Sequence, residues 1–166
     1  PHEIPSTTSK NTRNYPKIVT ETAPTTMSIL TDKQIRWRNR IIVALDCSGD
    51  EAVVLGEKLA GHARWVKIGM TLYYAVGPSI VNTMHKLGFK VFLDLKLHDI
   101  PHQVYGAASS IAQAGADLFT VHASGGELML ESAERGARRG AADAGHEDNV
   151  PAVCAITVLT SMDADQ

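Results

Sequence analysis

Residues 90–101 read KVFLDLKLHDIP, an apolar run in which charged residues replace apolar ones toward the end. Alternate side chains of an extended strand share a face, so one face here carries Phe92, Asp94 and Lys96. The other face is aliphatic and comprises Val91, Leu93, Leu95 and Leu97. A parallel strand of an open sheet is apolar on both faces, whereas charges near the carboxyl end of a strand are typical of a barrel mouth. The segment therefore favours a β/α-barrel strand.

Four more apolar runs, bounded by Gly or Asp, flank this segment; they are IIVALD from residue 41, RWVKIG from 64, DLFTVH from 117 and PAVCAITVL from 151. Between the runs, apolar residues recur at helical spacing, which predicts right-handed βαβ units on a parallel sheet. At this spacing eight units need roughly 220 residues, the size of a (β/α)8 barrel. We therefore predict an α/β fold, a (β/α)8 TIM barrel truncated after about five βα units. A complete five-stranded, doubly wound sheet of flavodoxin type is the alternative.

The amino-terminal segment differs in composition from the rest of the chain. Residues 1–26 contain four of the seven prolines and nine Ser or Thr residues, without helical or strand periodicity. This composition is typical of a disordered tail, because it offers too little apolar surface to bury. We therefore expect a disordered tail over 1–26 and a partial β/α-barrel domain over 27–166.

Composition and charge exclude several classes of protein. The 166 residues include 16 Lys and Arg against 18 Asp and Glu, a net charge of −2, which does not suit a nucleic-acid binder. No apolar run approaches the roughly 18 residues of a membrane span. The two cysteines, Cys47 and Cys154, form neither a disulfide framework nor a CxxC motif, which favours the reducing cytoplasm.

Charged residues stand near the ends of three successive predicted strands. Asp46 closes the first, Lys67 lies near the end of the second, and Asp94 and Lys96 lie in the third. Because parallel strands present their carboxyl ends at one edge, these groups should converge, and an alternating Asp/Lys array there indicates an active site.

The alternative is that the charged residues of the segment 90–101 have a purely structural role. Asp94 and Lys96 would then form a buried ion pair that serves the fold alone, since buried charges need partners. Asp99 would cap the following helix, and Pro101 would stand in its first turn.

Five motifs together resemble orotidine 5'-monophosphate decarboxylase in order and spacing; they are ALD at 44–46, KIG at 67–69, DLKLHDIP at 94–101, TVHA at 120–123 and LTSM at 159–162. The resemblance covers roughly residues 39–163. It implies conversion of orotidylate to uridylate in pyrimidine biosynthesis without a cofactor, in a cytoplasmic homodimer with shared active sites.

The resemblance also implies a role for each matching residue. Asp46 and Lys67 would hold ribose hydroxyls, and Asp94 would lie against the substrate carboxylate. Lys96 would protonate the ring carbon left by carbon dioxide, while Asp99 would belong to the neighbouring subunit's site. The remaining substrate-binding positions would be Ile100, Thr160 and Ser161.

Two other functions stay open. A magnesium-dependent sugar-phosphate decarboxylase of the same suprafamily resembles this chain in its DxKxxD motif, but has a metal-holding Glu where Lys67 stands, and a lysine repels a divalent cation. We therefore expect no metal, and we do not interpret the His98 and His102 pair as ligands. A non-catalytic five-stranded ligand-binding module is the other alternative. In the family, the phosphate is held by loops after the last two strands, so we expect this chain alone to be poorly active.

Overall fold

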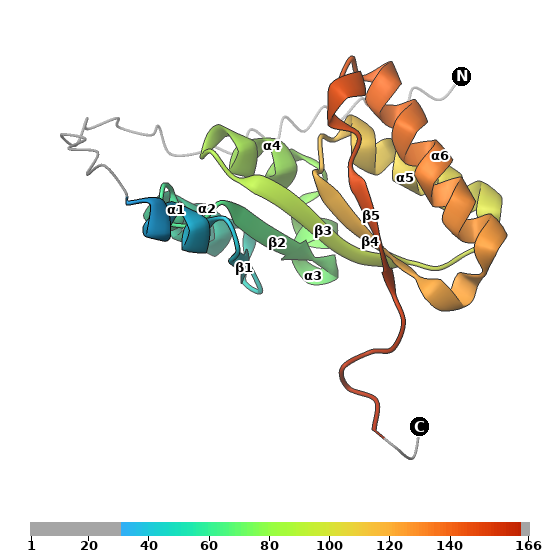
Figure 1. Ribbon diagram of the computed structural model, residues 1–166, viewed down its shortest axis with the longest axis horizontal. Coiled ribbons are helices and arrows are strands. Elements are labelled where there is room, and N and C mark those ends of the chain that lie inside the picture. The colour runs from blue at the N-terminus through green and yellow to red at the C-terminus, as the bar shows by residue number, and fades with distance from the viewer. Residues whose placement is uncertain (1–30, 164–166) are drawn as a thin grey trace, which may run out of the picture.

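The computed structural model describes residues 31–163, and within them five parallel strands form one sheet (Figure 1). The strands are β1 (Ile42–Ala44), β2 (Trp65–Gly69), β3 (Lys90–Leu97), β4 (Leu118–His122) and β5 (Ala152–Ile156). Each of the five apolar runs contains one strand, which confirms that part of the prediction. The predicted tail at 1–26 lies outside the described residues.

The order of the strands in the sheet distinguishes the two predicted architectures. Neighbours run β1-β2-β3-β4-β5, and every neighbouring pair is parallel. A flavodoxin-type sheet reverses direction and has the order 2-1-3-4-5, so the doubly wound alternative is wrong. A sequential order is that of a β/α barrel, in which each strand pairs with the next along the chain.

Helices connect the strands, and their bounds follow local signals in the sequence; they are α1 (Asp32–Arg38), α2 (Gly49–Leu59), α3 (Met70–Val76), α4 (Ser79–Lys86), α5 (Pro101–Gln113) and α6 (Glu127–Asp143). The capping box of Ser48 and Glu51 begins α2. Gly77 ends α3 with φ +81°, and Pro78 then starts α4. The segment between β2 and β3 therefore contains two helices.

The core lies between the helices and one face of the sheet. Its fully buried strand residues alternate along the sequence and include Val66, Ile68, Val91, Leu93, Phe119 and Val121. The opposite face holds Lys67, Phe92 and Asp94, which are only partly buried. The two faces are thus as distinct as the alternation in residues 90–101 predicts, and the charges lie on the face away from the helices.

Helices α5 and α6 pack closely side by side (Figure 1). Glycines of α6 make this approach possible, because a Cβ at Gly136 would overlap the carbonyl oxygen of Tyr105, and one at Gly140 that of Ser109. No helix between residues 31 and 163 is long and apolar enough to cross a membrane.

Candidate active site

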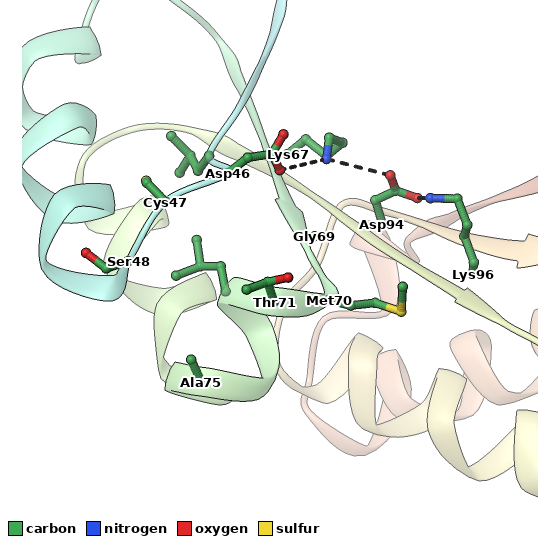
Figure 2. Close-up of a pocket in the computed structure, with 12 residues that line it drawn as sticks. Asp46, Cys47, Ser48, Lys67, Gly69, Met70, Thr71, Ala75, Asp94 and Lys96 are labelled. Atoms are coloured by element: carbon green, nitrogen blue, oxygen red, sulfur yellow. Dashed lines mark hydrogen bonds and ion pairs between the residues drawn. The ribbon is translucent and has the colours of Figure 1, made fainter. Parts of the chain in front are cut away.

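Four charged side chains meet where β1, β2 and β3 end (Figure 2). The ammonium of Lys67 lies 3.4 Å from Asp46 Oδ1 and 3.7 Å from Asp94 Oδ2. The ammonium of Lys96 donates to Asp94 Oδ1 over 2.7 Å. The groups therefore form a continuous row in which carboxylate and ammonium alternate. The predicted convergence of these residues is present in the structure.

The electrostatics of the row centre on Asp94, whose side chain is 16% exposed. Burial acts to raise the pKa of this carboxyl. Hydrogen bonds from Lys96 and Thr120, together with the charges of Lys96 and Lys67, outweigh burial and hold the pKa below its ordinary value. Asp94 is consequently an anion at neutral pH, flanked by two cations. Asp46, by contrast, is largely exposed.

An irregularity in β3 places Lys96. Leu93 pairs with Phe119 and Leu97 with Val121, so four steps along β3 correspond to two along β4. Lys96 within this bulge has φ +50°, in the left-handed region that residues other than glycine rarely adopt. Burial along β3 still alternates up to Lys96, and the alternation on which the sequence interpretation depends ends at Leu97, which is only partly buried. Within this irregular stretch the Lys96 ammonium lies 2.7 Å from Asp94 Oδ1, on the face that the two residues share.

Thr120 of β4 supports this bulge and was not predicted as a site residue. Its hydroxyl accepts a hydrogen bond from the Lys96 backbone N–H over 2.9 Å and donates one to Asp94 Oδ1 over 3.0 Å. The residue is fully buried. The sequence feature that could have identified Thr120 is a hydroxyl within the otherwise apolar stretch LFTV at 118–121, because a buried hydroxyl requires hydrogen-bond partners.

Two cavities adjoin the row and share Asp94 and Lys96. The first, of about 630 Å³, extends over Asp46, Lys67 and the first turn of α3. The second, of about 470 Å³, is lined by residues of β3 and β5 and by the loop that follows β5, including Thr160 and Ser161. The structure thus brings both loop residues to the same site as the charged row, each with an exposed side chain.

Asp99 and Ile100 lie apart from both cavities. They are exposed residues between β3 and α5, and Asp99 Oδ1 accepts a hydrogen bond from the backbone N–H of Ile100 over 2.6 Å. The N-cap of α5 is Ile100, without a side-chain cap, so the interpretation of Asp99 as the helix cap is wrong. Pro101 occupies the first turn, as predicted.

The donor set of the row does not suit a divalent cation. The ammonium of Lys67 occupies the space between the carboxylates of Asp46 and Asp94, where a metal ion would need to bind. Among residues 31–163, no three His, Cys, Asp or Glu side chains gather as a metal site. The ring of His98 lies against that of His122, with centroids 5.2 Å apart.

The sequential parallel sheet and the charged row at its carboxyl edge define a β/α-barrel protein with its site at the usual end of the strands. Residues 39–166 match the Orotidine 5'-phosphate decarboxylase / HUMPS family, and the chain belongs to this family.

Relatives in sequence and in structure agree with this assignment. Orotidine 5'-phosphate decarboxylase of Maridesulfovibrio salexigens is 46% identical over 129 residues, which cover 76% of this chain and 54% of that protein. The enzyme of the same name from Nitratidesulfovibrio vulgaris is 45% identical over 73% of this chain and 51% of its own. A crystal structure of the Lactobacillus acidophilus enzyme superposes with a TM-score of 0.69 at 40% identity, covering 77% of this chain and 56% of that one. The chain spans about half the length of the relatives it matches.

Proposed function

We propose that the protein containing this chain decarboxylates orotidine 5'-monophosphate to uridine 5'-monophosphate in pyrimidine biosynthesis. The observation that carries the proposal is the row of Asp46, Lys67, Asp94 and Lys96 at the mouth of the sheet, in a chain of this family. Relatives that are 45% and 46% identical to it over the aligned residues bear the name of this activity.

The chemistry demands a fixed electrostatic environment. The bond between the pyrimidine ring and the substrate carboxylate breaks, carbon dioxide leaves, and the electron pair stays on the ring carbon. A proton from Lys96 Nζ then adds to that carbon and completes uridylate. Because the carbanion has no electron sink, the site must favour negative charge where it develops, and preorganised cations do this. Lys96 is held for this step by its 2.7 Å contact with Asp94.

The other residues bind and orient the substrate. Asp46 and Lys67 border the larger cavity and would hold the ribose hydroxyls through their carboxylate and ammonium groups. Thr160 and Ser161 line the second cavity beside Lys96, where a planar ring with polar edges would meet their hydroxyls. The substrate would therefore lie across both cavities, with its carboxylate near Asp94.

Asp99 and Ile100 would serve the site of a second subunit in a homodimer. They are exposed and line neither cavity of their own chain, which supports this arrangement. The two cysteines are free and the family relatives are enzymes of metabolism, which favours the cytoplasm as the compartment.

The test is a direct assay of the full-length protein. Purified protein should release carbon dioxide from orotidylate and form uridylate, with the same rate before and after treatment with EDTA. Lys96→Met should lower kcat by roughly 10² to 10⁴, the usual contribution of a positioned proton donor. Lys86→Met, on the exposed surface of α4, is the matched control and should leave kcat unchanged.

Two results would contradict the proposal. Absence of decarboxylation by the full-length protein would refute the activity, and loss of the rate in EDTA would favour the magnesium-dependent sugar-phosphate chemistry. The shared site has its own test, since mixing Asp99→Asn with Lys96→Met protein should restore about a quarter of the activity through heterodimers with one intact site. No recovery after subunit exchange would place Asp99 outside the site.

A further inference from the structure

A single hydroxyl connects the two strands that build the charged row. Thr120 belongs to β4, whereas Asp94 and Lys96 belong to the bulged end of β3. The hydroxyl accepts from the backbone of Lys96 and donates to Asp94 Oδ1, so it uses both its hydrogen-bonding functions within one small space. The same oxygen of Asp94 accepts from the Lys96 ammonium. Thr120 thus contacts both the backbone of Lys96 and the carboxylate that holds its side chain.

The bulge explains why such a contact is needed. The left-handed backbone of Lys96, at φ +50°, is unfavourable for a lysine and persists only when surrounding contacts stabilise it. A bulge also interrupts the ladder of hydrogen bonds between strands, and the backbone N–H of Lys96 would lack its usual partner. The Thr120 hydroxyl supplies that partner from a side chain.

We propose that Thr120 is a positioning residue of the active site, and that its hydroxyl fixes the bulge of β3 so that the Lys96 ammonium stays on Asp94. Thr120 is fully buried and lines neither cavity, so it acts through Lys96 and Asp94 and not on the substrate. The activity part of the test rests on the proposed function, whereas the titration part does not.

The kinetic test uses three variants of the full-length protein. Thr120→Val removes the hydroxyl at nearly constant volume and should lower kcat by roughly 10²-fold, as expected for a misplaced catalytic group, with a change in KM below about threefold. Thr120→Ser keeps the hydroxyl and should keep kcat within about threefold of wild type. Thr83→Val is the control, because its hydroxyl donates to the carbonyl of Ser79 within α4, away from the site, and kcat should not change.

Thr120→Ser keeps the proposal falsifiable if Thr120→Val does not fold. A loss of kcat of roughly 10²-fold in the serine variant, which keeps the hydroxyl, would show that the methyl group and its packing matter, and would overturn the proposal. An unchanged kcat in a folded Thr120→Val protein would overturn it as well.

A titration separates this proposal from the proposed function. The Thr120 hydrogen bond is one of the contacts that lower the pKa of Asp94. Carboxyl-detected NMR of Thr120→Val should therefore show the Asp94 pKa raised above its wild-type value, and Thr120→Ser should show the wild-type value. An unchanged Asp94 pKa in Thr120→Val would overturn the positioning role. If the wild-type protein does not decarboxylate orotidylate, the proposed function fails, while the titration still decides the role of Thr120.

Discussion

Replacing a glycine with alanine should change the stability of the protein in opposite directions at two positions, one in α5 and one in the neighbouring helix α6. Gly140 of α6 faces the backbone of α5, where a Cβ would overlap the carbonyl oxygen of Ser109 and lie 2.8 Å from its Cα. Gly106 of α5 is exposed, and a Cβ there would meet no atom within 4 Å. Helix propensity favours alanine equally at both positions, so the tertiary contact alone distinguishes them.

The magnitudes follow from this geometry. Replacing a helical glycine with alanine stabilises a protein by about 0.5–1 kcal/mol, and Gly106→Ala should gain that amount. At Gly140 the obstacle is backbone, which cannot rotate away as a side chain does, so α5 and α6 must separate by roughly 1 Å. Overpacking of this kind costs about 1–3 kcal/mol, and the upper end of that range applies here. Gly140→Ala should therefore destabilise the protein by about 2 kcal/mol after the propensity gain is subtracted.

Urea unfolding of the full-length protein, followed by far-ultraviolet circular dichroism, measures both changes. The midpoint should rise for Gly106→Ala and fall for Gly140→Ala, with unchanged m-values. The two variants should differ in free energy of unfolding by about 3 kcal/mol. A Gly140→Ala protein at least as stable as wild type would refute the reasoning, because the close approach of the helices would then not depend on a missing side chain.

Two further changes test the charges of the structure. Lys67→Met removes the cation between two carboxylates of the candidate site, and steady-state kinetics should show kcat/KM lowered by roughly 10² to 10³. The control Lys86→Met should leave kcat/KM unchanged. If Lys67→Met has the same kcat/KM as wild type, Lys67 does not belong to the site. Asp117, at the other end of the sheet, is partly buried, and this burial acts to raise the pKa of its carboxyl. Hydrogen bonds from His85 and the Val91 backbone outweigh burial and hold the pKa below its ordinary value. A depressed pKa stabilises the fold above the unfolded-state pKa, and this contribution disappears as the pH falls through the folded-state pKa. Asp117→Asn should therefore lower Tm at pH 7 by the equivalent of roughly 1–3 kcal/mol and leave Tm nearly unchanged in acid. An equal loss of Tm at both pH values would show that the ionised Asp117 carboxylate does not stabilise the fold.

Some elements were beyond the reach of sequence patterns. The helix α1 has a capping box at Thr31 and Gln34 but no buried residue, so it lacks the apolar periodicity that indicates a helix. The helix α3 is too short to show a clear period before Gly77 ends it. Helices of these kinds depend on caps and neighbours more than on an apolar face.

For the candidate site, the sequence indicated which charged residues lie together more completely than it indicated their arrangement. Asp46, Lys67, Asp94 and Lys96 were identifiable because each stands near the end of an apolar run, and parallel strands bring such ends together. Thr120 was missed as a site residue, because its partners lie 24 and 26 positions away in the sequence.

The sequence by itself determined the parallel α/β fold, the location of the strands and the set of charged residues near their carboxyl ends, since all of these depend on local hydrophobic patterning. Tertiary structure decided between the two strand orders that the patterning left open, and it alone shows the bulge at Lys96 and the hydroxyl from β4 that contacts both Lys96 and Asp94. A bulge arises from the register between two strands, and a buried hydrogen bond from the distance between them. Both are properties of paired segments, which no single segment of the chain contains.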